Sequence, residues 1–287
     1  MSLKLLPAAP EARPRSGITC QMSPRALASW DSSIRAAVDD DRTIGIYDAI
    51  GYDYWTGDGV TAKRVAGALR SMGKGPVTVN VNSPGGDMFE GLAIYNLLRE
   101  HDGDVTVRVL GIAASAASII AMAGDDVLIA RAAFFMVHNA WVVAAGNRND
   151  FAELSSWLEP FDTAMADIYA ARTGDDVKAM SKLMDAETWI GGSDAVARNF
   201  ADSLLAADQV GESNGTQAKA AAVRRVESAL RASGMSRNEA QKLLSEFKSG
   251  LSDSAGSGES DSTEHAGSAG VMSALSGFQL PSFSLSR

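Results

Sequence analysis

The most constraining feature of this sequence is a strand pattern that is interrupted twice by short runs of small residues. Val77-Thr-Val-Asn-Val81 alternates valine with polar residues, as β-strands do, and Asn82-Ser-Pro-Gly-Gly86 then breaks the pattern. Val105-Thr-Val-Arg-Val109 repeats it and runs into Gly111-Ile-Ala-Ala-Ser-Ala-Ala-Ser118. Helical spacing of apolar residues follows each break. This β-α-β-α-β order predicts an α/β fold with crossover connections between parallel strands.

Further elements are expected on both sides of this pair. Apolar spacing predicts additional helices and strands, at Thr43–Tyr47, Thr61–Met72, Met88–Arg99, Val127–Ala130, Phe134–Val137, Asn149–Arg172, Asp176–Met184 and Ser193–Arg198. The helix at Asn149–Arg172 has a broad apolar stripe that includes Trp157, Phe161 and Tyr169. A peripheral helix rarely hides so much apolar surface by itself, so the stripe predicts an interface between copies of the chain.

The composition favours one core domain with extensions. Residues 1–41 are weakly patterned and are expected to form a flexible or loosely helical leader, and residues 42–208 hold the patterned domain. Residues 209–287 are expected to be helical at first and then a low-complexity tail. Ser252–Gly270 has almost no apolar side chain and cannot bury enough surface to fold, so it is expected to be disordered.

The charge and cysteine content exclude several classes of function. A net charge of −9 without a basic stripe argues against nucleic acid as a partner. The single cysteine, Cys20, cannot form an internal disulfide. The first 16 residues lack the apolar core of a signal peptide. The most apolar stretch, Gly111–Gly124, is shorter than the ~20 residues that a membrane span needs, so a cytoplasmic protein without a membrane partner is expected.

Two of the small-residue runs have the geometry that acyl-transfer chemistry requires. Ser115 is placed at a strand-to-helix turn, where a serine hydroxyl is exposed at the edge of a sheet. Gly85 and Gly86 let the backbone approach a ligand closely and direct N–H groups at a developing oxyanion. Taken singly, Asn82–Gly86 also fits an ordinary tight turn, and Gly111–Ser118 fits a serine N-cap of an alanine-rich helix.

A nucleophilic serine needs a base, and the sequence has three histidines. His265 lies in the low-complexity tail, and His101 follows a helix end, where a solvated capping role is expected. His138 directly follows the strand Phe134–Val137, at the rim of the predicted sheet, although a histidine in this position is often structural. His138 is therefore the candidate general base for Ser115.

Together and in this order, N-S-P-G-G, G-x-A-A-S and a strand ending in Met-Val-His resemble the ClpP family of serine peptidases. The resemblance extends over Val77–Leu204 and implies a ClpP/crotonase-like repeated ββα fold with a long handle helix. It implies Ser115 as nucleophile and His138 as base, and the amides of Gly86 and Ala116 as oxyanion hole. It also implies a ring-shaped homo-oligomer that acts on peptides or proteins, with no metal and no cofactor.

The third member of the triad is less clearly defined by the motif. In the resembling family an aspartate precedes an aromatic residue, and here the aromatic is Trp189 and the matching acid is Glu187. Asp185, two residues earlier, is the competing candidate. Glutamate can orient an imidazole as aspartate does, but its longer side chain requires a different geometry.

Four segments are closer to one branch of this family. The runs Asn82–Asp87, Ala113–Ser118, Val137–Ala140 and Met184–Trp189 resemble the head maturation proteases of tailed phages and prophages. That resemblance implies cleavage of capsid or scaffold protein, in the host cytoplasm or within the prohead. Whether a Clp-type ATPase docks on the protein stays open.

Two other functions, a crotonase-like enzyme and an inert scaffold subunit, are also compatible with this fold. Crotonases share the fold and bind acyl-CoA, but they do not require a serine–histidine pair. An inert ClpP-like scaffold subunit would not require one either. A Ser–Lys mechanism is disfavoured, because no lysine occurs between Lys74 and Lys178.

Overall fold

The computed structural model describes residues 6–8, 19–20, 22–36, 40–51, 59–206, 210–212, 223, 226–227, 230, 235 and 239–246. The chain divides into two compact units, Met1–Ala240 and Gln241–Arg287. In the second unit residues 241–246 are helical. The predicted low-complexity tail and His265 lie outside the described residues. All the features discussed below belong to the first unit.

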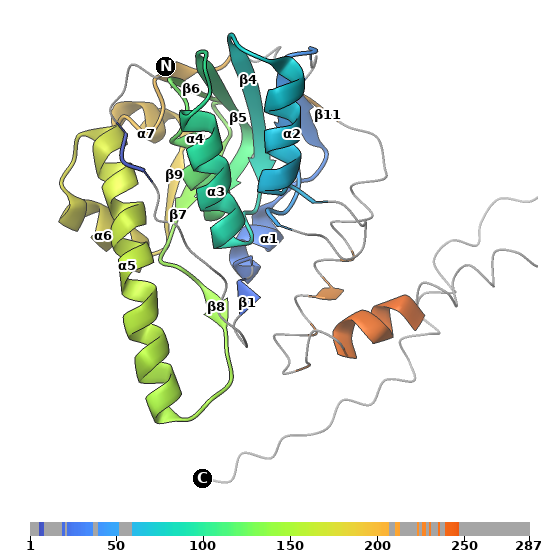
Figure 1. The fold of residues 1–287 in the computed structure, drawn as a ribbon, viewed down its shortest axis with the longest axis vertical. Helices are drawn as coiled ribbons and strands as arrows, with labels where there is room; N and C mark the ends of the chain where they lie inside the picture. The colour runs from blue at the N-terminus through green and yellow to red at the C-terminus, as the bar shows by residue number, and fades with distance from the viewer. Residues whose placement is uncertain are drawn as a thin grey trace, which may run out of the picture. The chain divides into compact units, whose positions relative to one another are not determined.

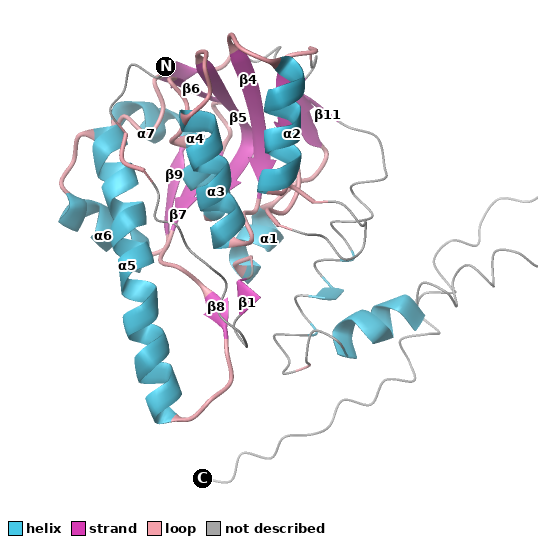
Figure 2. Cartoon of the chain, viewed as in Figure 1, coloured by secondary structure: helices cyan, strands magenta, loops and turns pink. Residues whose placement is uncertain are grey.

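A mostly parallel seven-stranded sheet forms the centre of the first unit (Figures 1 and 2). The order β10-β6-β5-β4-β3 is parallel throughout, and β7 pairs parallel with β5 and antiparallel with β9. The strands are β3 (Thr43–Ile46), β4 (Val77–Ser83), β5 (Val105–Ala114), β6 (Asp126–Ile129), β7 (Phe134–Val137), β9 (Thr188–Gly191) and β10 (Ser203–Leu204).

The long strand β5 has two successive partners on one edge. Its first half pairs with β6, and its last residues, Ile112–Ala114, pair with β7. On its other edge β5 pairs with β4, and the register of that pair shifts between Val81 and Ser83. The carboxyl ends of β4, β5 and β7 therefore converge, which brings the two small-residue runs and His138 to one edge of the sheet.

Helices cover the sheet because their apolar sides face its buried valines. In α2 the N-cap Thr61 accepts a hydrogen bond from the Arg64 amide, and Val65 and Leu69 face inward. The helices α2 and α3 lie side by side in Figure 1. The helices are α2 (Ala62–Met72), α3 (Met88–Arg99), α4 (Ala116–Ala121), α5 (Arg148–Thr173), α6 (Val177–Asp185) and α7 (Gly192–Ala197).

The two halves of α5 have different environments. The half from Phe161 onward is buried against the body of the domain, whereas the first half extends away from it (Figure 1). The predicted exposure of the whole apolar stripe is therefore wrong for Phe161, which is 8% exposed, and for Tyr169, which is 1% exposed. Periodicity identifies an apolar stripe but not which part of it faces the chain's own core.

The segment predicted as a flexible leader contains packed structure. Residues Pro24–Ser29 form helix α1, and Trp30, directly after it, is almost fully buried. Strand β2 (Ile34–Ala36) pairs with β11 (Val210–Glu212), and β1 (Thr19–Cys20) pairs with β8 (Val142–Val143). Long-range packing holds these elements, which are too short to show periodicity in the sequence.

None of the helices in the described part of the chain is both long and apolar enough to cross a membrane.

Candidate active site

Ser115 lies at the turn between β5 and α4, as the sequence predicted. Its φ of 56° and ψ of −125° are unusual for a residue with a side chain. The turn is held on both sides: the Ser115 amide donates to the Met136 carbonyl at 2.8 Å, and the Ser118 hydroxyl donates to the Ser115 carbonyl at 2.6 Å. A strained turn that is fixed in this way presents the serine Oγ outward from the strand end.

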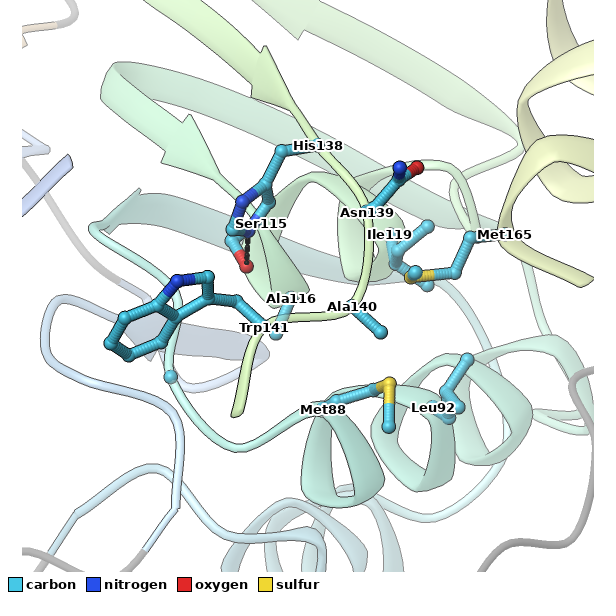
Figure 3. Close-up of a pocket in the computed structure, with 11 residues that line it drawn as sticks. Met88, Leu92, Ser115, Ala116, Ile119, His138, Asn139, Ala140, Trp141 and Met165 are labelled. Carbon is cyan, nitrogen blue, oxygen red and sulfur yellow. Dashed lines mark hydrogen bonds between the residues drawn. The ribbon is translucent and has the colours of Figure 1, made fainter. Parts of the chain in front are cut away.

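His138 directly follows β7, and its imidazole meets the serine. Its Nε2 lies 2.7 Å from the Ser115 Oγ (Figure 3). The two residues are brought together because β7 pairs with the end of β5, with Met136 opposite Ala114. The structure thus joins the predicted nucleophile and base in one hydrogen bond, with the geometry that proton abstraction requires.

The environment of His138 favours the neutral imidazole. Burial lowers the pKa of His138 from its usual 6.5, and the negative charge of Glu187 partly opposes this. A neutral ring has a lone pair on one nitrogen and can accept a proton from a hydroxyl. His138 is therefore already a base at near-neutral pH.

The two candidate acids have different partners. The pairing of Val137 with Thr188 in the antiparallel β7–β9 ladder places Glu187 across from His138. No hydrogen bond joins these two side chains among the described residues. The Glu187 Oε1 is buried without a hydrogen bond and lies 3.6 Å from the Arg25 Nη1. Asp185 accepts a hydrogen bond from the Asn139 side chain at 2.8 Å.

The glycine pair packs directly beside the serine. A Cβ on Gly85 would lie 2.5 Å from the Ala114 carbonyl oxygen and 2.7 Å from the Ser115 Cβ, so only glycine allows this approach. Gly86 forms a parallel bridge with Ile50, through hydrogen bonds made by Gly85 and Asp87. The N–H of Gly86 itself therefore points away from Ile50.

A pocket opens beside the serine–histidine pair. Its lining includes Gly86, Ser115, Ala116, His138 and Trp141. Figure 3 shows the Ser115 hydroxyl directed at the His138 ring. One part of the wall is apolar and comes from three helices, through Met88, Leu92, Ile119 and Met165. Such a wall suits an apolar side chain held next to the nucleophile.

A buried polar relay supports the serine turn from below. Because the Ser118 hydroxyl donates its hydrogen to the Ser115 carbonyl, the Tyr169 hydroxyl donates to Ser118, at 2.7 Å. Burial raises the pKa of Tyr169 far above its usual value, so the phenol stays protonated and remains a donor. Helix α5 thus contributes directly to the position of the nucleophile.

Asn82 ties the glycine turn to its surroundings. Its side-chain oxygen accepts from the Ile112 amide at 3.0 Å, and its Nδ2 donates to the carbonyls of Asp31 at 2.6 Å and Ile34 at 3.0 Å. The backbone carbonyl of Asn82 accepts from the Trp30 indole at 3.0 Å. These bonds satisfy the backbone where the β4–β5 register shifts, and so they fix the start of the turn.

Several of these contributors were not predicted from the sequence. The motif included Asn82 only as a turn residue, and Ser118 only as part of a small-residue run. Arg25 and Trp30 lie in the segment predicted as a leader. The Ser23-Pro24 pair, a helix N-cap followed by proline at the first helical position, was the one local signal for α1.

Fold and site together define an α/β protein with a serine–histidine pair at the carboxyl edge of a parallel sheet. A model of the Clp protease family matches residues 32–208, more than half of the chain. The chain belongs to the Clp protease family, and the prediction of a ClpP-like α/β fold is confirmed.

Several relatives are named as proteolytic subunits of ATP-dependent Clp proteases. The ATP-dependent Clp protease proteolytic subunit of Pleurastrum terricola is 30% identical over 135 residues, covering 46% of this chain and 67% of that protein. Subunit 3 of Rhodococcus jostii is 27% identical, covering 46% and 66%, so these two matches span about two thirds of each relative. Subunit 1 of Protochlamydia amoebophila is 27% identical over 176 residues, covering 60% and 84%.

A solved structure of a ClpP1 mutant from Listeria monocytogenes is similar with a TM-score of 0.49 and 22% identity, covering 58% of this chain and 92% of that one.

Proposed function

We propose that the protein is a serine endopeptidase in which Ser115 is the nucleophile and His138 the general base. The observation that carries this proposal is the 2.7 Å hydrogen bond from the serine on its strained turn to an imidazole whose pKa is lowered by burial. Family membership supports peptide bonds as the substrate class.

The residues perform the two steps of acyl transfer as follows. His138 removes the proton from the Ser115 hydroxyl as the oxygen attacks the scissile carbonyl carbon. The resulting oxyanion accepts hydrogen bonds from the amides of Gly86 and Ala116, which flank the pocket. His138 then gives its proton to the leaving amine, and a water molecule hydrolyses the acyl-enzyme by the same route in reverse.

Glu187 is the acid that this mechanism favours. Its negative charge opposes the lowering of the His138 pKa, and so it stabilises the imidazolium that forms during attack. Asp185 is bonded to Asn139 instead.

The biological role proposed is maturation of a phage or prophage head, with capsid or scaffold protein as the substrate. The support is that the sequences of four segments around the site, from Asn82–Asp87 to Met184–Trp189, resemble those of head maturation proteases. The place of action is then the host cytoplasm or the prohead interior. Neither a metal nor a cofactor takes part in the proposed steps.

The protein is further proposed to act as a ring-shaped homo-oligomer. The support is the extended first half of α5, where Phe151 is 48% exposed and Leu154, Trp157 and Leu158 are only partly covered. Apolar side chains on a projecting helix are typical of an interface. Enclosure in a ring would restrict access to the nucleophile.

The test is labelling and proteolysis with the purified full chain. Wild-type protein should react with a fluorophosphonate at Ser115, located by mass spectrometry of tryptic peptides, and should cleave casein and the neighbouring capsid protein. Ser115→Ala should lose the label and at least about 10³-fold in kcat, and His138→Ala should be comparably inactive. Both variants should keep the wild-type circular dichroism spectrum.

Acyl-CoA binding without any labelling of Ser115 would point to the crotonase class instead. Absence of labelling, proteolysis and acyl-CoA binding alike would leave the protein an inert subunit and overturn the proposal.

A further inference from the structure

The strand β8, next to the pocket, already has a partner from the same chain. Trp141 lines the pocket, and β8 begins at the following residue, Val142. Thr19 pairs antiparallel with Val143, and Cys20 with Val142. Figure 1 shows β1 beside β8. A backbone edge that borders the nucleophile is therefore covered by the N-terminal segment.

The direction of this pairing leads the segment to the site. Because Thr19 faces Val143 and Cys20 faces Val142, β1 runs from Thr19 to Cys20 in the direction of Trp141 and the pocket. An extended polypeptide that adds to a strand edge makes the same kind of main-chain pairing. The N-terminal segment thus lies on the edge that an extended substrate would use to approach Ser115.

The continuation of the segment is anchored much more firmly than β1. Leu27 and Trp30 are buried in a small cluster with Ile112, Ala114 and Met136, which frame the Ser115 turn. In contrast, β1 has only two residues. Each net hydrogen bond contributes about 1 kcal/mol, so β1 can leave β8 while α1 stays in place.

The same segment also reaches the proposed triad acid. Arg25, on α1, lies 3.6 Å from the Glu187 Oε1, on the side chain that the mechanism requires near His138. Both ends of the segment therefore contact groups that the reaction uses, one at the substrate edge and one at the acid.

We propose that the N-terminal segment, through Thr19–Cys20 on the edge of β8, acts as an internal pseudosubstrate strand that blocks access of polypeptides to Ser115 until it is displaced. This inference rests on the proposed peptidase function. A tethered segment competes at an effective concentration on the order of millimolar. This is about 10³ times the concentration of a micromolar substrate, so a segment that binds the edge as well as a substrate does would outcompete it.

The chain offers a direct test, since Cys20 is its only cysteine. Val142→Cys places a second thiol opposite Cys20, and directly opposed residues of an antiparallel pair are within disulfide range, at about 4.5–5.5 Å between Cα atoms. Copper–phenanthroline oxidises the two thiols to a disulfide that locks β1 on β8, and dithiothreitol reverses it. The matched control combines Val142→Cys with Cys20→Ser, which cannot form the bond.

The readouts are cleavage of fluorescent casein and fluorophosphonate labelling of Ser115. Oxidised Val142→Cys protein should cleave casein at about one tenth of the rate of the same variant after reduction, or more slowly still, because the tethered strand then excludes the substrate. The cleavage rate of the control should not change with oxidant. Of Thr19→Pro and Cys20→Pro, the variant at the hydrogen-bonded position removes a bond to β8 and should cleave casein faster than the wild type.

The outcomes separate the two proposals. If the disulfide forms completely and casein cleavage is unchanged, the blocking role is wrong although the labelled serine still supports the peptidase. If no disulfide forms, β1 is not seated on β8 and the inference is overturned. If Ser115 is unlabelled in every state, the peptidase proposal fails and the pseudosubstrate role fails with it.

Discussion

Ser115 and Glu187, both proposed to take part in the reaction, have positive φ angles, of 56° and 46°. Side-chain-bearing residues in this region are strained by about 1–3 kcal/mol and persist only where their surroundings hold them. At Ser115 the holding groups are the Met136 carbonyl and the Ser118 hydroxyl. At Glu187 the amide donates to the Met184 carbonyl at 3.0 Å. The backbone at both positions is therefore fixed before substrate arrives.

Glu187→Gln should change the pH dependence as well as the rate. Burial lowers the His138 pKa and the Glu187 charge raises it, so removing the charge should lower the pKa further. The base must be neutral, and activity is lost as pH falls through this pKa. The acid limb of kcat/KM should therefore lie below pH 6.5 in the wild type and move to lower pH in the variant, while kcat falls.

Asp185→Asn is the matched control for this measurement. Its carboxylate bonds Asn139, and the acid limb should stay where the wild type has it. If only Asp185→Asn loses activity and moves the limb, Asp185 is the orienting acid and the assignment of Glu187 is wrong.

The relay below the serine turn predicts non-additive stability changes. Ser118→Ala leaves the buried Tyr169 hydroxyl without its partner and should lower the free energy of unfolding by about 1–3 kcal/mol, while Tyr169→Phe should lower it by about 1 kcal/mol. The double variant should be less destabilised than the sum of the two, as measured by urea unfolding. Strict additivity would show that the two hydroxyls do not interact.

At the scale of elements, the site is the meeting point of two strand ends and one turn. β5 ends directly before Ser115 and β7 directly before His138, and the turn after β4 brings Gly85 against the β5 end. The atoms nearest Gly85 are the Ala114 carbonyl oxygen, the Ser115 Cβ and the Ala116 amide nitrogen, and rotation about a side-chain bond moves none of them.

Gly85→Ala should therefore reduce activity strongly, although the substitution adds only one methyl group. Its φ of 84° disfavours alanine, and the new Cβ would meet the Ala114 oxygen and the Ser115 Cβ. We expect a loss of kcat together with a lower melting temperature. Gly67→Ala is the control, because in helix α2 its Cβ meets only the end of Arg70 at 4.0 Å.

That control should be stabilised by about 0.5–1 kcal/mol, since alanine is favoured over glycine in a helix interior. Full activity in Gly85→Ala would show that the turn is not part of the catalytic geometry.

The sequence predicted the elements that carry a strong local pattern. The strand at Val77 and the helix over Asn149–Arg172 were found as Val77–Ser83 and Arg148–Thr173, and the serine lies at its expected turn. These elements are long or alternate regularly, so their periodicity can be recognised from residues that are close together in the sequence.

Features made by long-range pairing could not be predicted in this way. The position of Glu187 across from His138 follows from the β7–β9 ladder, and nothing local to either residue specifies that register. Likewise, α1 has six residues and is held by the burial of Trp30 beneath Ile112 and Met136, far away in the sequence. Tertiary packing, rather than propensity, decides such short elements.

In the whole molecule, the first half of α5 is a helix segment whose apolar side chains are left partly exposed by the rest of the chain. Phe151→Glu should dissociate the proposed ring and lower activity, although no catalytic residue changes, because a charge in an apolar interface is costly to desolvate. Analytical ultracentrifugation at micromolar concentration measures the size of the assembly. Val177→Glu, an exposed valine at the start of α6, is the control and should leave the assembly intact.

Phe161→Glu is expected to behave differently from Phe151→Glu. The Phe161 ring packs edge-on against Phe89 at 5.7 Å and Trp157 at 5.1 Å, inside the protomer. A charge there should unfold the protomer itself, as seen by circular dichroism. A fully active monomer in the wild type would rule out the ring.

The antiparallel β7–β9 pair determines when, during synthesis, the proposed active site can be completed. Ser115 and His138 leave the ribosome before Glu187, which follows His138 by 49 residues (187 − 138). Until Thr188–Gly191 has been made and paired with Phe134–Val137, β7 lacks one neighbour and the histidine faces no acid. N-terminal parts of a chain fold as they emerge, at about 5–20 residues per second. A nascent chain therefore carries Ser115 and His138 for several seconds before Glu187 can pair with them, and the proposed peptidase activity would begin only when β9 is in place.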